Sequence, residues 1–236
     1  GGYLVALAAS MQHIFEAVPG ETYFSTSDIG WVVGHSYIVY GPLIAGMATI
    51  MYEGLPTRGL QGEENPGIWW QLVEKYNVTR MFSAPTAVRV LRKQDPAYLT
   101  KYDKSSLKAL YLAGEPLDET TAKWISEGLN VPIIDNYWQT ETGWPILTIA
   151  NGVEKKPSKF GSPGIAMYGY NVKLFDENTG EELHGANQKG VVAIEGPLPP
   201  GCMQTVWGDD ERFVKTYWSS FKARQVYSTF DWGIRD

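Results

Sequence analysis

The chain has 236 residues, of which 44% are hydrophobic, enough for a sizeable core in one or two domains. Its net charge of −6 and its lack of any run of more than two basic residues argue against general binding of nucleic acid. A membrane-spanning helix needs about 18 consecutive apolar residues, and no apolar run in the sequence is that long. The single cysteine, Cys202, cannot form a disulfide within the chain, which suits a reducing cytoplasm.

Helical and strand patterns alternate through the first part of the chain. Apolar residues at helical spacing predict helices, and short apolar runs predict strands. The expected elements, in chain order, are a helix over 3–15, a strand over 23–25, a buried helix over 37–45, a strand over 48–52, a loop over 56–67, a helix over 68–76, a strand over 78–83, a helix over 85–93, a strand over 107–112, a helix over 118–128 and a strand over 131–137. This alternation predicts an α/β fold with a doubly wound, mostly parallel sheet.

After about Pro145 the pattern changes. Short strands are predicted over 171–175 and 190–195, with turn chemistry at 176–180, and helical spacing returns only over 210–219. We therefore expect residues 1–145 to form the α/β sheet portion of a domain and residues 146–236 to form a smaller β-rich subdomain of the same domain.

The segment 134–143 carries the strongest chemical signal. It follows the apolar run 131–134, and its last seven positions, 137–143, gather two aromatics, an amide, two hydroxyls and one carboxylate before Gly143. Ligands of α/β proteins bind where such strands end. There Thr140 can donate a hydrogen bond to a phosphate oxygen, and Glu141 can hold a hard divalent cation.

The run Tyr-Trp-Gln-Thr-Glu-Thr-Gly at 137–143 resembles the adenylate-binding motif of the acyl-adenylate-forming superfamily, in the form found in short-chain acyl-CoA synthetases. Further segments resemble that family in the same order, at 28–37, 52–56, 82–86, 112–117, 208–213 and 227–233. The resemblance covers essentially the whole chain. It implies the large N-terminal, AMP-binding domain of such an enzyme.

The reaction that this resemblance implies has two steps. A carboxylate attacks the α-phosphorus of ATP, which gives an acyl-adenylate and pyrophosphate, and the thiol of coenzyme A then displaces AMP. The substrates supply both nucleophiles, so catalysis rests on positioning and on charge neutralisation by Mg²⁺ and the protein. The absence of a Ser-His-Asp set or a Gly-x-Ser-x-Gly motif from the sequence fits this chemistry.

The resemblance also implies roles for individual residues. Thr140 and Glu141 would be catalytic, and Glu141 would hold Mg²⁺. The residues implied to surround the nucleotide are Gly114, Glu115, Pro116, Asp135, Asn136, Tyr137, Trp138, Gln139, Thr140 and Asp231. Asp231 would bind the ribose hydroxyls. Phe230 departs from the family pattern, which has glycine before that aspartate, and this puts the local backbone geometry in question.

The acyl pocket implied by the same resemblance consists of Val32, Val33, Ala113 and Trp138. Trp138 would close its floor and restrict the acid to very few carbons. Acetate-specific relatives have valine at the position of Ala113 and threonine at that of Val33, so this chain has more room and a more apolar wall. Both differences favour propionate. Val33 and Thr57 would contact coenzyme A.

The expected function is therefore formation of propionyl-CoA in the cytoplasm, with no membrane or nucleic-acid partner. An acetyl-CoA synthetase and a non-catalytic nucleotide-binding fragment are the alternatives, and the lack of a Gly-x-Gly-x-x-Gly motif argues against a dinucleotide oxidoreductase. The chain starts without Met and stops at Asp236. We expect a fragment without the family's phosphate loop and C-terminal domain, and we expect it to be inactive alone.

Overall fold

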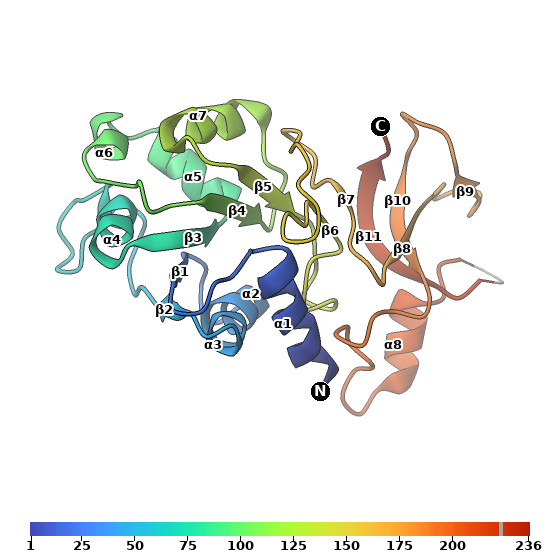
Figure 1. Ribbon diagram of the computed structural model, residues 1–236. Coiled ribbons are helices and arrows are strands. Elements are labelled where there is room, and N and C mark those ends of the chain that lie inside the picture. The colour runs from blue at the N-terminus through green and yellow to red at the C-terminus, as the bar shows by residue number, and fades with distance from the viewer. Residues whose placement is uncertain (222–223) are drawn as a thin grey trace.

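A parallel sheet forms the centre of the first part of the chain in the computed structural model, which describes residues 1–221 and 224–236 (Figure 1). Its strands follow the order β2-β1-β3-β4-β5, and every neighbouring pair is parallel. The strands are β1 (Thr22–Ser25), β2 (Ala48–Ile50), β3 (Val78–Ser83), β4 (Ala109–Ala113) and β5 (Ile133–Asn136). The predicted α/β fold with a parallel sheet is confirmed.

Helices cover both faces of this sheet (Figure 1). One face packs against α4 (Ile68–Tyr76), α5 (Pro85–Arg92) and α7 (Glu119–Leu129), in a cluster of buried residues such as Trp70 and Ile125. The other face packs against α1 (Gly2–His13) and a helical run over residues 32–44, around Phe15 and Tyr37. The short α6 (Ala97–Thr100) was not predicted. No helix in the described part of the chain is long and apolar enough to cross a membrane.

The helical run over residues 32–44 differs from the predicted helix over 37–45. It begins earlier and consists of α2 (Val32–Gly34), the π-helical η1 (His35–Tyr40) and α3 (Gly41–Ile44). The N–H of Gly41 donates to the carbonyl of Ser36, five residues back, and Pro42 has no N–H to donate. A π turn is a way to pass such a break without ending the helix.

The expected cap of α7 is confirmed, because the side chain of Asp118 accepts a hydrogen bond of 2.8 Å from the N–H of Thr121. At the other end, Asn130 takes the left-handed conformation in which helices commonly terminate. The Asp118 cap fixes the loop that follows β4, where three of the predicted nucleotide residues lie.

An antiparallel sheet of order β11-β10-β8-β9 forms the later part of the chain. Its strands are β8 (Asn171–Phe175), β9 (Glu182–Leu183), β10 (Lys189–Glu195) and β11 (Val226–Ile234), and it is accompanied by α8 (Asp210–Tyr217) and by the small pair β6 (Leu147–Thr148) and β7 (Ile165–Ala166). Strands β8 and β10 and helix α8 were predicted, whereas β6, β7, β9 and β11 were not. The domain division at residue 145 stays a prediction.

A bulge interrupts the pairing of β10 with β11. Val191 is paired with Trp232, but Ala193 is paired with Ser228, so β11 holds two more residues than β10 between these pairs. Within the bulge Phe230 has a φ of +63°, in the left-handed region that favours glycine. This backbone conformation accounts for the glycine of the family pattern, and Phe230 adopts it despite its side chain. The bulge includes Asp231 and redirects β11 at that residue.

Candidate active site

The carboxyl ends of β4 and β5 place two predicted motifs side by side. Ala113 is paired with Asn136, so the chain leaves the sheet at Gly114 on one strand and at Tyr137 on the next. Gly114 has a φ of +102°, and a Cβ atom built there would meet no atom within 4 Å. The backbone at this point is therefore open to a flat group such as a nucleotide base.

The turn after β5 is held rigidly by its own hydrogen bonds. Tyr137 accepts from the N–H of Ile146 at 2.8 Å and donates its own N–H to Leu147 at 2.9 Å. The hydroxyl of Thr142 donates to the carbonyl oxygens of Gln139 and Trp144, at 3.0 and 3.1 Å. These bonds fix the segment that carries Trp138, Gln139, Thr140 and Glu141. Thr140 is exposed, and its hydroxyl forms no hydrogen bond with the described residues.

Asn136 is buried and its side chain is used within the protein. Its amide donates to the carbonyl oxygens of Ile134 and Leu112 at 3.1 and 3.3 Å, and its side-chain oxygen accepts from Thr148 at 2.7 Å. Asn136 therefore joins β4, β5 and β6 behind the site.

The neighbouring Asp135 is only partly exposed, and burial raises its pKa to about 6 although the N–H of Asn136 donates to it at 2.9 Å. A carboxyl group with a raised pKa at the end of a strand is typical of ligand sites.

Asp231 meets the turn after β5 from the antiparallel sheet. Its Oδ2 accepts from the hydroxyl of Tyr137 at 2.6 Å and from the amide of Gln139 at 2.8 Å. The same amide donates to the carbonyl of Thr229 at 2.7 Å. The hydroxyl of Tyr227 donates to the side-chain oxygen of Gln139 at 3.2 Å. Burial, together with the Asp231 carboxylate, raises the pKa of Tyr137, so the phenol keeps its proton. Three of the predicted site residues are thus brought together.

Glu141 contacts helix α8. Its Oε1 accepts from the hydroxyl of Tyr217 at 2.9 Å, and its carbonyl accepts from the N–H of Met203 at 2.7 Å. Tyr217 in turn stacks on Tyr227, with ring planes 7° apart and centroids 5.3 Å apart. Oε2 of Glu141 accepts no hydrogen bond from the described residues. One carboxylate with an available oxygen fits Mg²⁺, which binds through one or two carboxylates and the phosphates of a substrate.

Comparison with known proteins shows the family of the chain. Residues 2–207 match the family model described as AMP-binding enzyme. The chain belongs to the AMP-binding enzyme family. It is 65% identical over 236 residues to the propionate–CoA ligases of Salmonella typhimurium and Escherichia coli. It is 39% identical over 239 residues to the human mitochondrial acyl-CoA synthetase short-chain family member 3.

These alignments cover all of this chain but only 36% of each bacterial ligase and 34% of the human protein. The chain therefore spans about a third of the length of these relatives. The resemblance to short-chain acyl-CoA synthetases, and among them to propionate–CoA ligases, is confirmed.

The side chain of Glu115 is held by other residues of the protein. Its carboxylate accepts from the N–H of Thr86 and from Nη1 of Arg89, each at 2.7 Å. Partial burial acts to raise the pKa of Glu115, but these hydrogen bonds outweigh it and hold the pKa below its usual value. Arg89 also donates to Pro116 at 2.9 Å and to Asp118 at 2.9 Å. Arg89 thus clamps the loop that follows β4.

Sequence reasoning missed Arg89 and Tyr217. Arg89 lies one turn into α5, just after the segment 82–86 that resembles the family. Its position soon after the carboxyl end of β3 was the one signal in the sequence that could have indicated a role near the site. Tyr217 is the last residue of α8, and no local pattern in that helix indicates that it reaches a residue 76 positions earlier.

Three of the four predicted acyl-pocket residues belong to one hydrophobic cluster. Ala113 is buried in it, and Val33 and Trp138 pack against it. The indole of Trp138 meets the ring of Tyr37 edge-on, with centroids 5.4 Å apart. Val32 lies half-buried in α2, outside that cluster.

The predicted coenzyme A contact Thr57 lies in the loop between β2 and α4. Its carbonyl accepts from Asn65 at 2.9 Å, and no hydrogen bond of the described residues joins it to the site.

Proposed function

We propose that this chain is part of an acid–CoA ligase that forms propionyl-CoA from propionate, ATP and CoA through a propionyl-adenylate, with release of AMP and pyrophosphate. The observation that carries the proposal is the convergence of Tyr137 and Gln139 on Asp231 at the end of β5. The 65% identity to two propionate–CoA ligases supports the choice of acid.

The nucleotide would lie across the ends of β4 and β5. The open backbone at Gly114 leaves room for adenine, with Glu115 and Pro116 held beside it by Arg89. Oδ2 of Asp231 is engaged by Tyr137 and Gln139, which leaves Oδ1 to accept a hydrogen bond from a ribose hydroxyl. In this arrangement Tyr137 and Gln139 orient Asp231.

Thr140 and Glu141 would act on the phosphates. The exposed hydroxyl of Thr140 can donate to an oxygen of the α-phosphate. Mg²⁺, when bound, would neutralise the charge that develops on the phosphate oxygens during adenylation. Glu141 offers that cation one carboxylate oxygen, while Tyr217 fixes the orientation of the other.

The size of the acid would be set by Ala113, Val33 and Trp138, which share one apolar cluster. One more buried methylene contributes about 0.8 kcal/mol of binding free energy. Alanine at position 113 leaves space for that group, so we propose that propionate is preferred over acetate. Val32 would border the same pocket, and Val33 and Thr57 would contact coenzyme A.

The proposal is tested by Glu141→Gln in the complete gene product. We expect adenylation, measured as pyrophosphate release with propionate, to fall by about 100-fold or more, because Mg²⁺ loses its carboxylate. Affinity for AMP should change little. The matched control is Glu119→Gln, an exposed carboxylate in the first turn of α7. Undiminished pyrophosphate release by the Glu141 variant would contradict the proposed role.

A further inference from the structure

A cavity lies near the amino ends of the strands of the parallel sheet, whereas the candidate active site lies at the carboxyl ends. Its volume is about 640 Å³. It is lined by Glu16, Arg80, Lys108, Pro132, Ile134, Asn151, Lys155, Lys156, Pro157 and Ser158. Lys108 and Pro132 come directly before β4 and β5, and Arg80 is the third residue of β3. The candidate active site lies at the carboxyl ends of β4 and β5, so the sheet separates the two.

The cavity concentrates positive charge in an acidic protein. Four cationic side chains line it, against one carboxylate, although the whole chain has a net charge of −6. Two acids that do not line it, Glu21 and Glu154, lie beside it and contact its lysines. Even with these acids included, the cations outnumber the carboxylates. Such a local excess in a concave site attracts anions.

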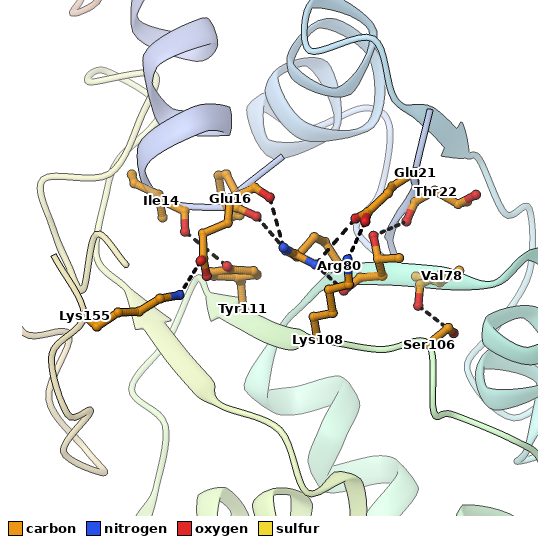
Figure 2. Close-up of polar contacts among 12 residues, drawn as sticks. Ile14, Glu16, Glu21, Thr22, Val78, Arg80, Ser106, Lys108, Tyr111 and Lys155 are labelled. Atoms are coloured by element: carbon orange, nitrogen blue, oxygen red, sulfur yellow. Dashed lines mark hydrogen bonds and ion pairs between the residues drawn. The ribbon is translucent and has the colours of Figure 1, made fainter. Parts of the chain in front are cut away.

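Arg80 forms the rigid base of this cavity. It is only 5% exposed, and its guanidinium donates to the carbonyl oxygens of Phe15 at 2.8 Å, Glu16 at 3.0 Å and Thr79 at 3.1 Å. Figure 2 shows Arg80 between Glu16 and Glu21, with Lys108 just below it and Lys155 beyond Glu16. Glu21 lies 3.7 Å from Arg80, and its Oε2 has no hydrogen-bond partner among the described residues. The arginine charge is therefore fixed in place.

The three lysines are exposed and each contacts one carboxylate. Lys108 contacts Glu21, Lys155 contacts Glu16, and Lys156 contacts Glu154 at 3.0 Å. An ammonium group has three N–H donors, so each lysine retains donors for a second acceptor. Surface ion pairs of this kind contribute little stability and exchange partners readily.

We propose that this cavity binds a small anion with at least two phosphate groups, held by Lys108, Lys155 and Lys156 around the fixed charge of Arg80. Phosphate groups fit because their many oxygens accept hydrogen bonds from several lysines at once, and Asn151 and Ser158 add neutral donors. A volume of about 640 Å³ exceeds what a single carboxylate or chloride fills. The bound anion joins the segment 151–158 to the ends of β3 and β4.

The test uses inorganic pyrophosphate as the probe and titration calorimetry of the complete gene product as the readout. Lys155→Gln combined with Lys156→Gln should raise the Kd by about tenfold or more, because charge-assisted hydrogen bonds are lost. Glu16→Gln should lower the Kd, because Lys155 loses its competing carboxylate. The matched control is Lys123→Gln with Lys189→Gln, which makes the same change of charge at exposed positions on α7 and β10, two elements that contribute no residue to the lining of the cavity.

Two outcomes would overturn the proposal. Equal weakening by the control pair would mean that pyrophosphate responds only to the overall charge of the protein. A Kd that changes with Glu141→Gln or Asp231→Asn but not with the cavity variants would place pyrophosphate at the candidate active site instead. As a second readout, pyrophosphate should raise the Tm of the wild-type protein and of the control pair, and should raise that of the cavity double variant by less at the same pyrophosphate concentration.

Discussion

The phenol of Tyr137 donates a hydrogen bond of 2.6 Å to Oδ2 of Asp231, a residue 94 positions later in the chain. The bond joins the end of β5 in the parallel sheet to the bulge of β11 in the antiparallel sheet. The side-chain amide of Gln139 donates a second hydrogen bond to the same oxygen, so the carboxylate of Asp231 holds both Tyr137 and Gln139. The candidate nucleotide site is therefore shared between the two sheets.

Removal of this bond should destabilise the chain measurably. Tyr137→Phe should lower the free energy of unfolding by about 1 kcal/mol, since Asp231 is exposed and water replaces part of the lost interaction. A double-mutant cycle with Asp231→Asn, followed by urea denaturation, should give a coupling energy of about 0.5 kcal/mol or more. Tyr76→Phe serves as the control, because Tyr76 is 44% exposed. Strict additivity of the two substitutions would show that the bond does not form in solution.

Tyr217→Phe should affect the use of Mg²⁺ rather than the binding of the acid. The substitution leaves Glu141 without its hydrogen-bond donor, and partners of this kind typically change metal affinity by about 10-fold or more. In the complete gene product, the Mg²⁺ concentration at half-maximal pyrophosphate release should rise by about that factor, with the KM for propionate nearly constant. An unchanged Mg²⁺ dependence with a lower Tm would assign Tyr217 to packing alone.

Asp135→Asn should stabilise the chain in a pH-dependent manner. Burial raises the folded-state pKa of Asp135 to about 6 from an ordinary value of 3.8, so the folded protein binds the proton more tightly than the unfolded chain. The contribution of the protonated Asp135 carboxyl to folding stability is fully present below pH 3.8 and is lost as the pH rises through 6. The advantage of the variant should therefore be small near pH 4 and reach at most about 3 kcal/mol above pH 6.

Chemical denaturation at pH 4.5 and 7.5 measures this difference. Asp176→Asn is a control of opposite sign, because the backbone N–H groups of Thr179 and Asn178 lower the pKa of Asp176. The stabilising effect of the native Asp176 carboxylate is present above pH 3.8 and is lost as the pH falls, so the variant loses stability above pH 3.8. Equal stability gains for Asp135→Asn at both pH values would mean that Asp135 is not held in a desolvated environment.

Ala113→Val should reverse the preference among short acids. Valine adds two methyl groups at a position that is 6% exposed and shares a cluster with Val33 and Trp138. The ratio of kcat/KM for propionate over that for acetate should fall by about 10-fold to 200-fold, the usual effect of one methylene in a tight pocket. The measurement compares both acids in the complete gene product. A constant ratio would remove Ala113 from the acyl pocket.

Much of the parallel sheet could be predicted from local patterns. The bounds of α4 and β3 agree with the prediction, because α4 has a strong amphipathic period and all six residues of β3 are buried. The strand β11 was not predicted, since Ser228, Thr229 and Asp231 interrupt its apolar residues. Its pairing with β10 depends on contacts between distant segments, which no local pattern reports.

The candidate site divides in the same way. The family motifs named Tyr137, Gln139 and Asp231, and the structure brings these three together. The same motifs could not indicate that Glu115 accepts from Arg89, because that contact depends on how α5 packs beside the end of β4. The π turn in the run over residues 32–44 was likewise invisible, since it depends on hydrogen bonds around Gly41 and Pro42.

The bond between Gln139 and Asp231 spans 92 residues, and this sets an order of events during synthesis. A ribosome that adds about 5–20 residues per second makes Asp231 roughly 5–20 s after Gln139. The strands of the parallel sheet exist by then, while the ligand site still lacks its aspartate. A nascent chain can therefore fold around β1–β5 before it can hold a nucleotide in the proposed way. The proposed nucleotide affinity would develop only after β11, which carries Asp231, has been synthesised.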